Sequence, residues 1–212
     1  MKILAISGSG RKDRMTHNVI KELLKDCKDE VEIISLAGKK INGCIGCTAC
    51  AGDNKCKVQD DWNEIGEKME QADMIVFGAP DYFGSINALA HVCLERTYSF
   101  RHRSIFSLKD KLGVIVSTCE TRDRKDPVGE FIKKMFDFNH IKTIGKVQVN
   151  QYSQCYTCGY GHDCEAGMVV YKHGILEEIL PSHIPHEVNC QDETLKEIKA
   201  FRNVLIENGV KF

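Results

Sequence analysis

The stretch KILAISGSGRKDRMTHN (residues 2–18) is typical of the first strand and helix of an α/β fold. A short apolar run, 2–7, ends in the small residues SGSG, and residues 16–27 then carry apolar side chains at helical spacing. The next segment, EVEIISL (30–36), alternates apolar and polar residues as a strand does. The chain therefore opens with a β-α-β unit.

The alternation of strands and helices continues to residue 150. The later segments are predicted strands at 73–80, 111–118 and 142–150 and predicted helices at 60–72, 86–97 and 127–138. Asp61 stands three residues before Glu64, which predicts a capping box, and Pro127 suits the first position of a helix. Five strands that alternate with helices predict an α/β fold, a doubly wound five-stranded parallel sheet covered on both faces.

From about residue 151 the alternation stops. A second group of cysteines and a proline-containing segment precede a helix expected near 192–208. We therefore divide the chain into a sheet domain, 1–150, and a cysteine-rich C-terminal extension with a terminal helix, 151–212.

Composition excludes some classes of partner. The formal net charge of the 212 residues is −1, which favours neither nucleic acid nor an anionic membrane. No apolar run is long enough for a signal peptide or a membrane span, so we expect a cytoplasmic protein. In a reducing cytoplasm the 11 cysteines are expected to be thiols or metal ligands rather than disulfides.

The loop after the first strand suits a phosphate group. It offers the hydroxyls of Ser7, Ser9 and Thr16, the guanidinium of Arg11 and a helix N-terminus. It matches neither a Walker loop nor the GxGxxG fingerprint, and a Ser/Gly loop with one arginine suits a monophosphate better than a diphosphate. The alternative is a plain strand-to-helix turn.

Four cysteines lie within thirteen residues, spaced C-x2-C-x2-C-x5-C: Cys44, Cys47, Cys50 and Cys56. Three successive cysteines with two-residue gaps, followed by a fourth, resemble the ligand spacing of ferredoxins. Structural zinc instead favours paired C-x2-C knuckles separated by a longer loop. This spacing predicts a [4Fe-4S] cluster, with zinc and free thiols as the alternatives.

A second cysteine group, Cys155, Cys158 and Cys164, repeats part of that spacing in CYTCGYGHDC. We expect a second metal site or cluster here, with Cys190 as the fourth ligand or, failing that, His162 or a residue of another subunit. The alternatives are a redox-active Cys155–Cys158 pair and a thiol-rich loop at a subunit interface. Elsewhere, Cys27 and Cys93 fall within helical patterns and are expected to pack as small core residues.

Three motifs in order resemble a known family: ISGSGRK (6–12), the cysteine stretch 44–56 with QDD (59–61), and APDYFGSINALAHVCLERT (79–97). Over about residues 1–150 the chain is similar to the iron–sulfur flavoproteins of anaerobic archaea and bacteria. These belong to the NADPH-dependent FMN reductase superfamily of flavodoxin-like folds. The resemblance implies an FMN-binding domain at 1–150, with a cluster loop at 43–57.

The resemblance also implies which residues bind FMN. The phosphate would be held by Ser9, Arg11, Thr16 and Asn18; the isoalloxazine ring would be lined by Pro80, Asp81, Tyr82, Phe83 and Gly84; and a third loop, Ser117, Thr118 and Cys119, would also reach the flavin. No side chain is expected to be indispensable as an acid or a nucleophile.

The chain departs from the family pattern at a few positions. Gly10 replaces a common Pro, and Asp13-Arg14 replaces a more usual Gly, so the phosphate loop is expected to follow a different path. Asp81 replaces an apolar residue. Its carboxylate either faces the ring, where it would oppose an anionic reduced flavin, or is a solvated turn residue.

Family resemblance suggests an electron-transfer oxidoreductase. Ferredoxin or a similar carrier would donate single electrons through the cluster to FMN, and a small molecule would accept them. A homodimer or homotetramer is expected, because cluster and flavin in the family are thought to meet across a subunit interface. Two alternatives stay open: a clusterless NAD(P)H-dependent FMN or quinone reductase, and a non-enzymatic redox or metal sensor.

Overall fold

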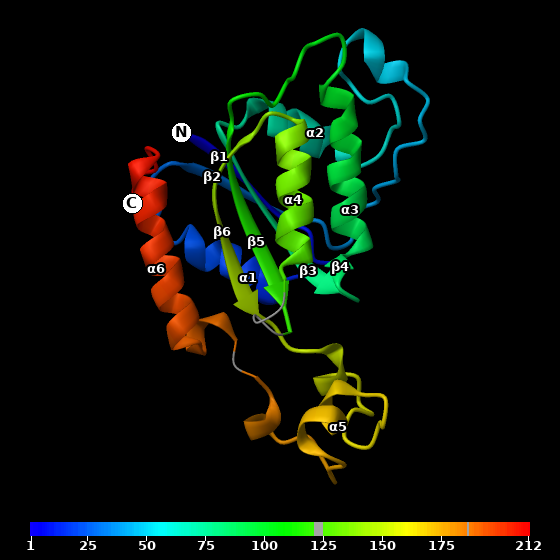
Figure 1. The fold of residues 1–212 in the computed structure, drawn as a ribbon, viewed down its shortest axis with the longest axis vertical. Coiled ribbons are helices and arrows are strands. Elements are labelled where there is room, and N and C mark those ends of the chain that lie inside the picture. Colours follow the sequence, from blue (N-terminus) through cyan, green and yellow to red (C-terminus); the bar gives the residue numbers. More distant parts are fainter. Residues whose placement is uncertain (121–124, 186) are drawn as a thin grey trace.

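The computed structural model describes residues 1–120, 125–185 and 187–212, with the backbone but not the side chain of Cys190. Its centre is a parallel sheet with the strand order β2-β1-β3-β5-β6 (Figure 1). These strands span Lys2–Ser7 (β1), Glu30–Ser35 (β2), Met74–Tyr82 (β3), Leu112–Cys119 (β5) and Lys142–Asn150 (β6). A short strand, β4 (Ser85–Ile86), pairs antiparallel with β3. The predicted doubly wound parallel sheet is confirmed.

Helices cover both faces of the sheet. The helices are α1 (Met15–Leu23), α2 (Trp62–Gln71), α3 (Ala88–Glu95), α4 (Pro127–Phe138), α5 (Met168–His173) and α6 (Asp192–Glu207). One buried core joins the sheet to α2, α3 and α4, and a second core joins its other face to α1 and α6. Because both faces are buried, β3 begins with seven consecutive buried residues instead of an alternating pattern.

Three loops meet at the carboxyl edge of the sheet. Ser7 pairs with Gly78, and Pro80 pairs with Thr118, so β1, β3 and β5 end side by side. Helix α3 starts at this edge, where the Asn87 amide Nδ2 donates a 2.8 Å hydrogen bond to the carbonyl of Gly8. It ends beside the loop of residues 43–57, which we call the first cysteine loop. There the Cys44 N–H donates to the Glu95 carboxylate at 3.0 Å. The carboxyl edge of the sheet and the first cysteine loop therefore lie at opposite ends of α3 (Figure 1).

Most predicted segments are found within two residues of their expected ends. The helix predicted at 16–27 ends earlier, at Leu23, because the chain turns through a positive φ of 65° at Asp26. The helix predicted at 86–97 divides into α3 and a 3-10 segment, Arg96–Phe100. Strand β4 was missed because two residues are too short to show a period.

The predicted capping box at Asp61 and Glu64 is wrong. Asp61 precedes α2 but makes no side-chain cap. Its carboxylate instead accepts the N–H of Lys40 at 2.7 Å, and the Asp60 carboxylate accepts the N–H of Trp62 at 3.1 Å. The start of α2 is therefore fastened to the chain just before the first cysteines.

Residues after β6 form two parts. Helix α6 returns to the sheet, and its Ile198 and Leu205 are buried in the second core. The segment between β6 and α6 has a small core of its own, made by Tyr152, Tyr156 and Val169. This segment, which we call the cysteine module (residues 152–184), lies beyond the carboxyl edge of the sheet (Figure 1).

Candidate flavin and metal sites

The phosphate loop, residues 8–14, follows β1 at the carboxyl edge. Gly8 is required here, because a Cβ would stand 2.6 Å from the Cβ of Ala90. Ser9 is buried, and its hydroxyl accepts the N–H of Arg11 at 3.1 Å. At Gly10 a Cβ would meet nothing within 4 Å, so this part of the loop faces open space.

Thr16 and Thr118 come together across the site. Their hydroxyl oxygens are 2.9 Å apart and share one hydrogen bond. Thr118 also donates to the Gln151 side chain at 3.1 Å. The amide of Asn18 donates to the carbonyl of Asp13 at 3.4 Å, so it supports the backbone of the phosphate loop.

The segment expected to line the isoalloxazine ring is a hairpin between β3 and β4. Phe83 and Gly84 form its turn with φ of 58° and 74°, and the side chain of Phe83 is fully exposed. The Asp81 carboxylate accepts the N–H of Gly84 at 2.7 Å, so it is a turn residue here. Pro80 is buried behind the turn, and Tyr82 is half-buried at its side.

Side chains at the end of β5 point to both faces of the sheet. Thr118 faces α1, whereas the Ser117 hydroxyl donates to the Asp126 carboxylate at 3.0 Å, at the start of α4. Cys119 is buried, and its sulfur accepts a 3.3 Å hydrogen bond from the side chain of Gln148. The three residues predicted to reach the flavin are gathered at the carboxyl edge, but their side chains also bond to protein groups.

In the described part of the chain, several buried polar atoms have no hydrogen-bond partner, and three of them bear on the phosphate loop. These three are Ser7 Oγ, Arg11 Nε and Asn87 Oδ1. Buried polar atoms are nearly always hydrogen-bonded, so these atoms suit a polar ligand. With two serines, a guanidinium and the N-terminus of α1, the edge fits a flavin phosphate.

The first cysteine group surrounds one cavity. Cys44, Cys47, Cys50 and Cys56 all line it, beside Arg96 and Tyr98. Burial is the main cause of the raised pKa of the Cys50 thiol, and the nearness of the other three thiols adds to it. In the described part of the chain no three His, Cys, Asp or Glu side chains are close enough to hold a metal ion. Four thiols without a carboxylate are nevertheless the donor set that iron–sulfur clusters take.

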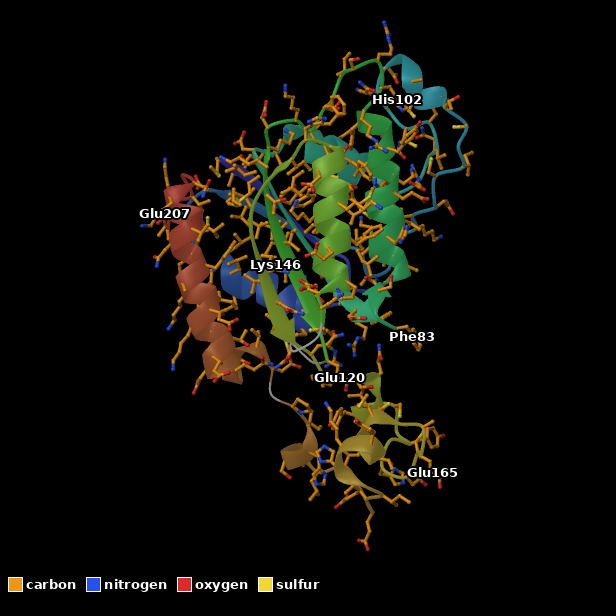
Figure 2. The ribbon with its side chains drawn as sticks, in the orientation of Figure 1. Phe83, His102, Glu120, Lys146, Glu165 and Glu207 are labelled. Atoms are coloured by element: carbon orange, nitrogen blue, oxygen red, sulfur yellow. The ribbon has the colours of Figure 1, made fainter. Side chains whose placement is uncertain are left out.

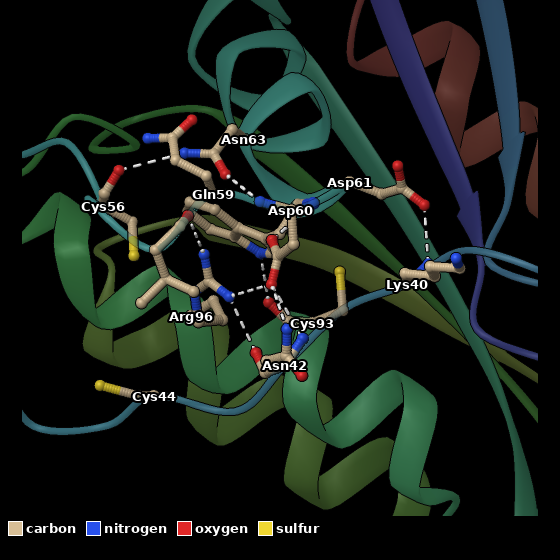
Figure 3. A network of polar contacts seen from close by, with 12 residues as sticks. Lys40, Asn42, Cys44, Cys56, Gln59, Asp60, Asp61, Asn63, Cys93 and Arg96 are labelled. Atoms are coloured by element: carbon tan, nitrogen blue, oxygen red, sulfur yellow. Dashed lines mark hydrogen bonds and ion pairs between the residues drawn. The ribbon is translucent and has the colours of Figure 1, made fainter.

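Arg96 fastens both arms of the first cysteine loop (Figure 3). Its guanidinium donates to the carbonyl of Asn42 at 2.8 Å, on the arm before Cys44, and to the carbonyl of Val58 at 3.1 Å, on the arm after Cys56. It also donates at 2.8 Å to the Asp60 carboxylate, which in turn accepts the N–H of Asn42 at 2.9 Å. We call Arg96 and Asp60 the loop clamp.

The loop clamp is a buried ion pair. Arg96 is 1% exposed and stands over the ring of Trp62, 5.0 Å from its centroid. Burial lowers the pKa of Arg96, but Asp60 and the nearby Cys56 thiol outweigh burial and raise it. The guanidinium of Arg96 therefore lies beside the Cys56 sulfur of the first cysteine loop, paired with the Asp60 carboxylate.

Sequence reasoning missed the loop clamp and His102. The Nε2 atom of His102 lies 3.0 Å from the Cys50 sulfur, so the ring is a candidate hydrogen-bond donor to that sulfur. Arg96 lies in LERT (94–97), at the end of an apolar helical pattern. An arginine in such a pattern is a candidate for a buried, paired side chain, and this signal could have been used. His102 follows a loop without a pattern, and nothing in the sequence pointed to it.

The second cysteine group lies in the cysteine module. Cys155 is half-buried, and Cys158 and Cys164 are exposed. Hydrogen bonds from Ser153 and from the N–H of Met168 lower the pKa of the Cys155 thiol. The side chain of Cys190, the proposed fourth ligand, lies outside the described part of the chain.

The remaining two helical-pattern cysteines pack in the cores. Cys93 is fully buried, and burial raises the pKa of its thiol to about 12. Cys27, just after α1, is half-buried against the second core.

Among the described residues, no helix is both long and apolar enough to cross a membrane.

Comparison with known proteins identifies the family. Residues 1–153 match the family model of NADPH-dependent FMN reductases. An iron–sulfur flavoprotein of Methanocaldococcus jannaschii is 38% identical over 126 residues, which are 58% of this chain and 64% of that protein. One of Methanosarcina thermophila is 32% identical over 144 residues, 66% of this chain and 74% of that protein.

Solved structures share the fold. The apo form of an NADH:FMN oxidoreductase has a TM-score of 0.56 and 14% identity, covering 95% of this chain and 88% of that one. A Trp repressor binding protein of Bacillus subtilis has a TM-score of 0.52 and 18% identity, covering 72% and 88%. The chain therefore belongs to the iron–sulfur flavoproteins of the NADPH-dependent FMN reductase family and is a flavin-dependent oxidoreductase with a flavodoxin-like fold.

Proposed function

We propose that this chain transfers electrons between a one-electron donor and a small acceptor, using FMN at the carboxyl edge and a [4Fe-4S] cluster in the first cysteine loop. The observation that carries the proposal is the set of four thiols around one cavity, on a loop whose two arms are both bonded to Arg96, the residue after α3. Such a cluster passes single electrons, whereas a flavin holds one or two, so the pair can connect both kinds of partner.

The chain's own residues bind and orient the flavin. Ser9, Arg11 and the start of α1 would hold the phosphate, while Asn18 would support that loop. Pro80, Tyr82 and the exposed Phe83 turn would position the ring. Thr16 and Thr118, which bond to each other, would fix the distance between the two parts of the site.

The separation of the two sites supports an oligomer. His102, beside Cys50, lies at one end of the molecule, and Phe83 and Glu120 lie toward the other (Figure 2). We propose a homodimer or homotetramer in which the first cysteine loop of one copy approaches the flavin edge of another. Ferredoxin or a similar carrier is the proposed donor. The proposed location is the cytoplasm, where the 11 cysteines of the chain would stay reduced or bind metal.

Replacing Arg11 with Ala is expected to weaken FMN binding by about 1.5–3 kcal/mol, the range for hydrogen bonds to a charged group. Riboflavin, which has no phosphate, should lose much less. Titration of apoprotein with both flavins measures this, and Lys12→Ala, next to it on the exposed loop, is the matched control. Equal losses for both flavins, or none for either, would remove Arg11 from the phosphate site.

Rapid-mixing kinetics under anaerobic conditions test the function. Reduced ferredoxin should reduce the flavin of the wild type, and Cys47→Ala should slow this reduction by orders of magnitude while its FMN content is unchanged. If NADPH reduces the flavin rapidly in both proteins and ferredoxin does so in neither, the chain is the clusterless reductase. A protein that turns over with neither donor would favour the sensor.

A further inference from the structure

The three cysteines of the cysteine module lie outside the part of the chain that matches the family. The family match ends at residue 153, whereas Cys155, Cys158 and Cys164 follow it. Cys158 and Cys164 are exposed, so packing into an apolar core does not explain them. The module nevertheless has an ordered small core around Tyr156 and Val169, which gives the cysteines a fixed support.

A tight turn presents the sulfur of Cys158. Gly159 has φ of 87°, a value that side chains rarely adopt, and this turns the N–H of Tyr160 toward the Cys158 sulfur at 3.4 Å. The Cys158 thiol itself donates to the carbonyl of Cys155 at 3.4 Å. Backbone groups of its own loop therefore hold the Cys158 sulfur in place at the surface of the module.

The loop then closes on the other two cysteines. Gly161 packs so tightly that a Cβ there would overlap the carbonyl oxygen of Cys155. The N–H of Met168 donates to the Cys155 sulfur at 3.4 Å, and a Cβ at Gly167 would stand 3.4 Å from the Cys164 sulfur. The sulfurs of Cys155 and Cys164 therefore lie near the neighbouring residues Met168 and Gly167.

We propose that Cys155, Cys158 and Cys164 bind a second metal centre, an iron–sulfur cluster or a zinc ion held by thiolates. Both are bound by three or four cysteines at such spacings, and a histidine can complete either set. His162 lies in the same loop between Cys158 and Cys164, and Cys190 is the other candidate for the fourth ligand. The inference does not depend on the first cysteine group.

The cysteine module is attached to the edge of the sheet that is proposed to bind the flavin. The Gln154 amide donates to the Tyr82 hydroxyl at 3.3 Å, and Lys172 pairs with Glu120 at 3.3 Å, so the module is attached to the β3 and β5 loops of its own chain. Figure 2 shows Glu165 of the module below Phe83 and Glu120. The second centre is thus on the flavin side, and the first cysteine loop is at the far end of α3.

Metal analysis of anaerobically purified protein tests the proposal. The wild type should contain about eight irons per chain if both centres are [4Fe-4S] clusters, or about four irons and one zinc if the second is zinc. Cys158→Ala and, separately, Cys164→Ala should each lose only the metal of the second centre. Cys47→Ala should lose only the iron of the first cluster. Cys27→Ala, at a half-buried cysteine far from both groups, is the matched control and should lose neither.

The outcomes separate this proposal from the proposed function. Unchanged metal in both Cys158→Ala and Cys164→Ala overturns the second centre, as does a Cys155–Cys158 disulfide in the metal-analysed wild type. Unchanged metal in Cys47→Ala instead overturns the first cluster and leaves the second intact. Circular dichroism and retained FMN check that each variant is folded, and Cys158→Ser repeats the test with a smaller change of shape.

Discussion

Cys47→Ala is expected to lose about four irons per chain, with the matching sulfide, and to keep its FMN. The iron is lost because each cysteine of the loop would hold one corner of a cluster. The flavin is kept because its loops lie at the other end of α3. Iron, acid-labile sulfide and flavin are measured on the same anaerobic sample.

Cys27→Ala is the control for the loss of a thiol as such. This residue is half-buried against the second core and lines neither cysteine site. Full iron and sulfide in Cys47→Ala would show that the ligand assignment is wrong. Loss of FMN together with iron would contradict the separation of the two sites.

Arg96→Met is expected to lower the free energy of unfolding by about 3–5 kcal/mol, because it leaves the Asp60 carboxylate buried without its cation. The side chains of this pair are 0% and 4% exposed, so water cannot replace the arginine. The same variant should incorporate less iron, since both arms of the first cysteine loop lose their attachment. Urea unfolding and metal analysis measure the two effects.

A double-mutant cycle isolates the ion pair. Arg96→Met/Asp60→Leu should lose less stability than the sum of the two single variants, because no unpaired charge stays buried. Arg103→Met is the matched control: this arginine is exposed, donates one 3.2 Å hydrogen bond to the carbonyl of Gly52, and should change stability by less than about 0.5 kcal/mol. Additive losses in the cycle would count against the loop clamp.

The periodic segments could be predicted from the sequence because their patterns are local. The apolar run at 2–7 and the Pro-led segment at 127–138 are β1 and α4 with the predicted ends. Hydrophobic periodicity reports burial on one or both faces of an element, and this is what a doubly wound sheet requires of each strand and helix.

The rest depended on contacts between distant parts of the chain. The local sequence around Asp60 and Asp61 predicts a helix start. In the structure, Asp61 bonds to Lys40, and Asp60 bonds to Asn42 and to Arg96, which is 36 positions away. No local pattern predicts such pairs. The spacing of the first cysteines predicts a cluster but not the position of their loop, which is set by the attachment of Cys44 to the end of α3.

The proposed function requires that one chain carry both a flavin and an iron–sulfur cluster. Quantifying FMN, iron and acid-labile sulfide per chain in protein purified without oxygen tests it most directly. We expect one FMN with at least about four irons and as many sulfides. FMN with neither iron nor sulfide would contradict it.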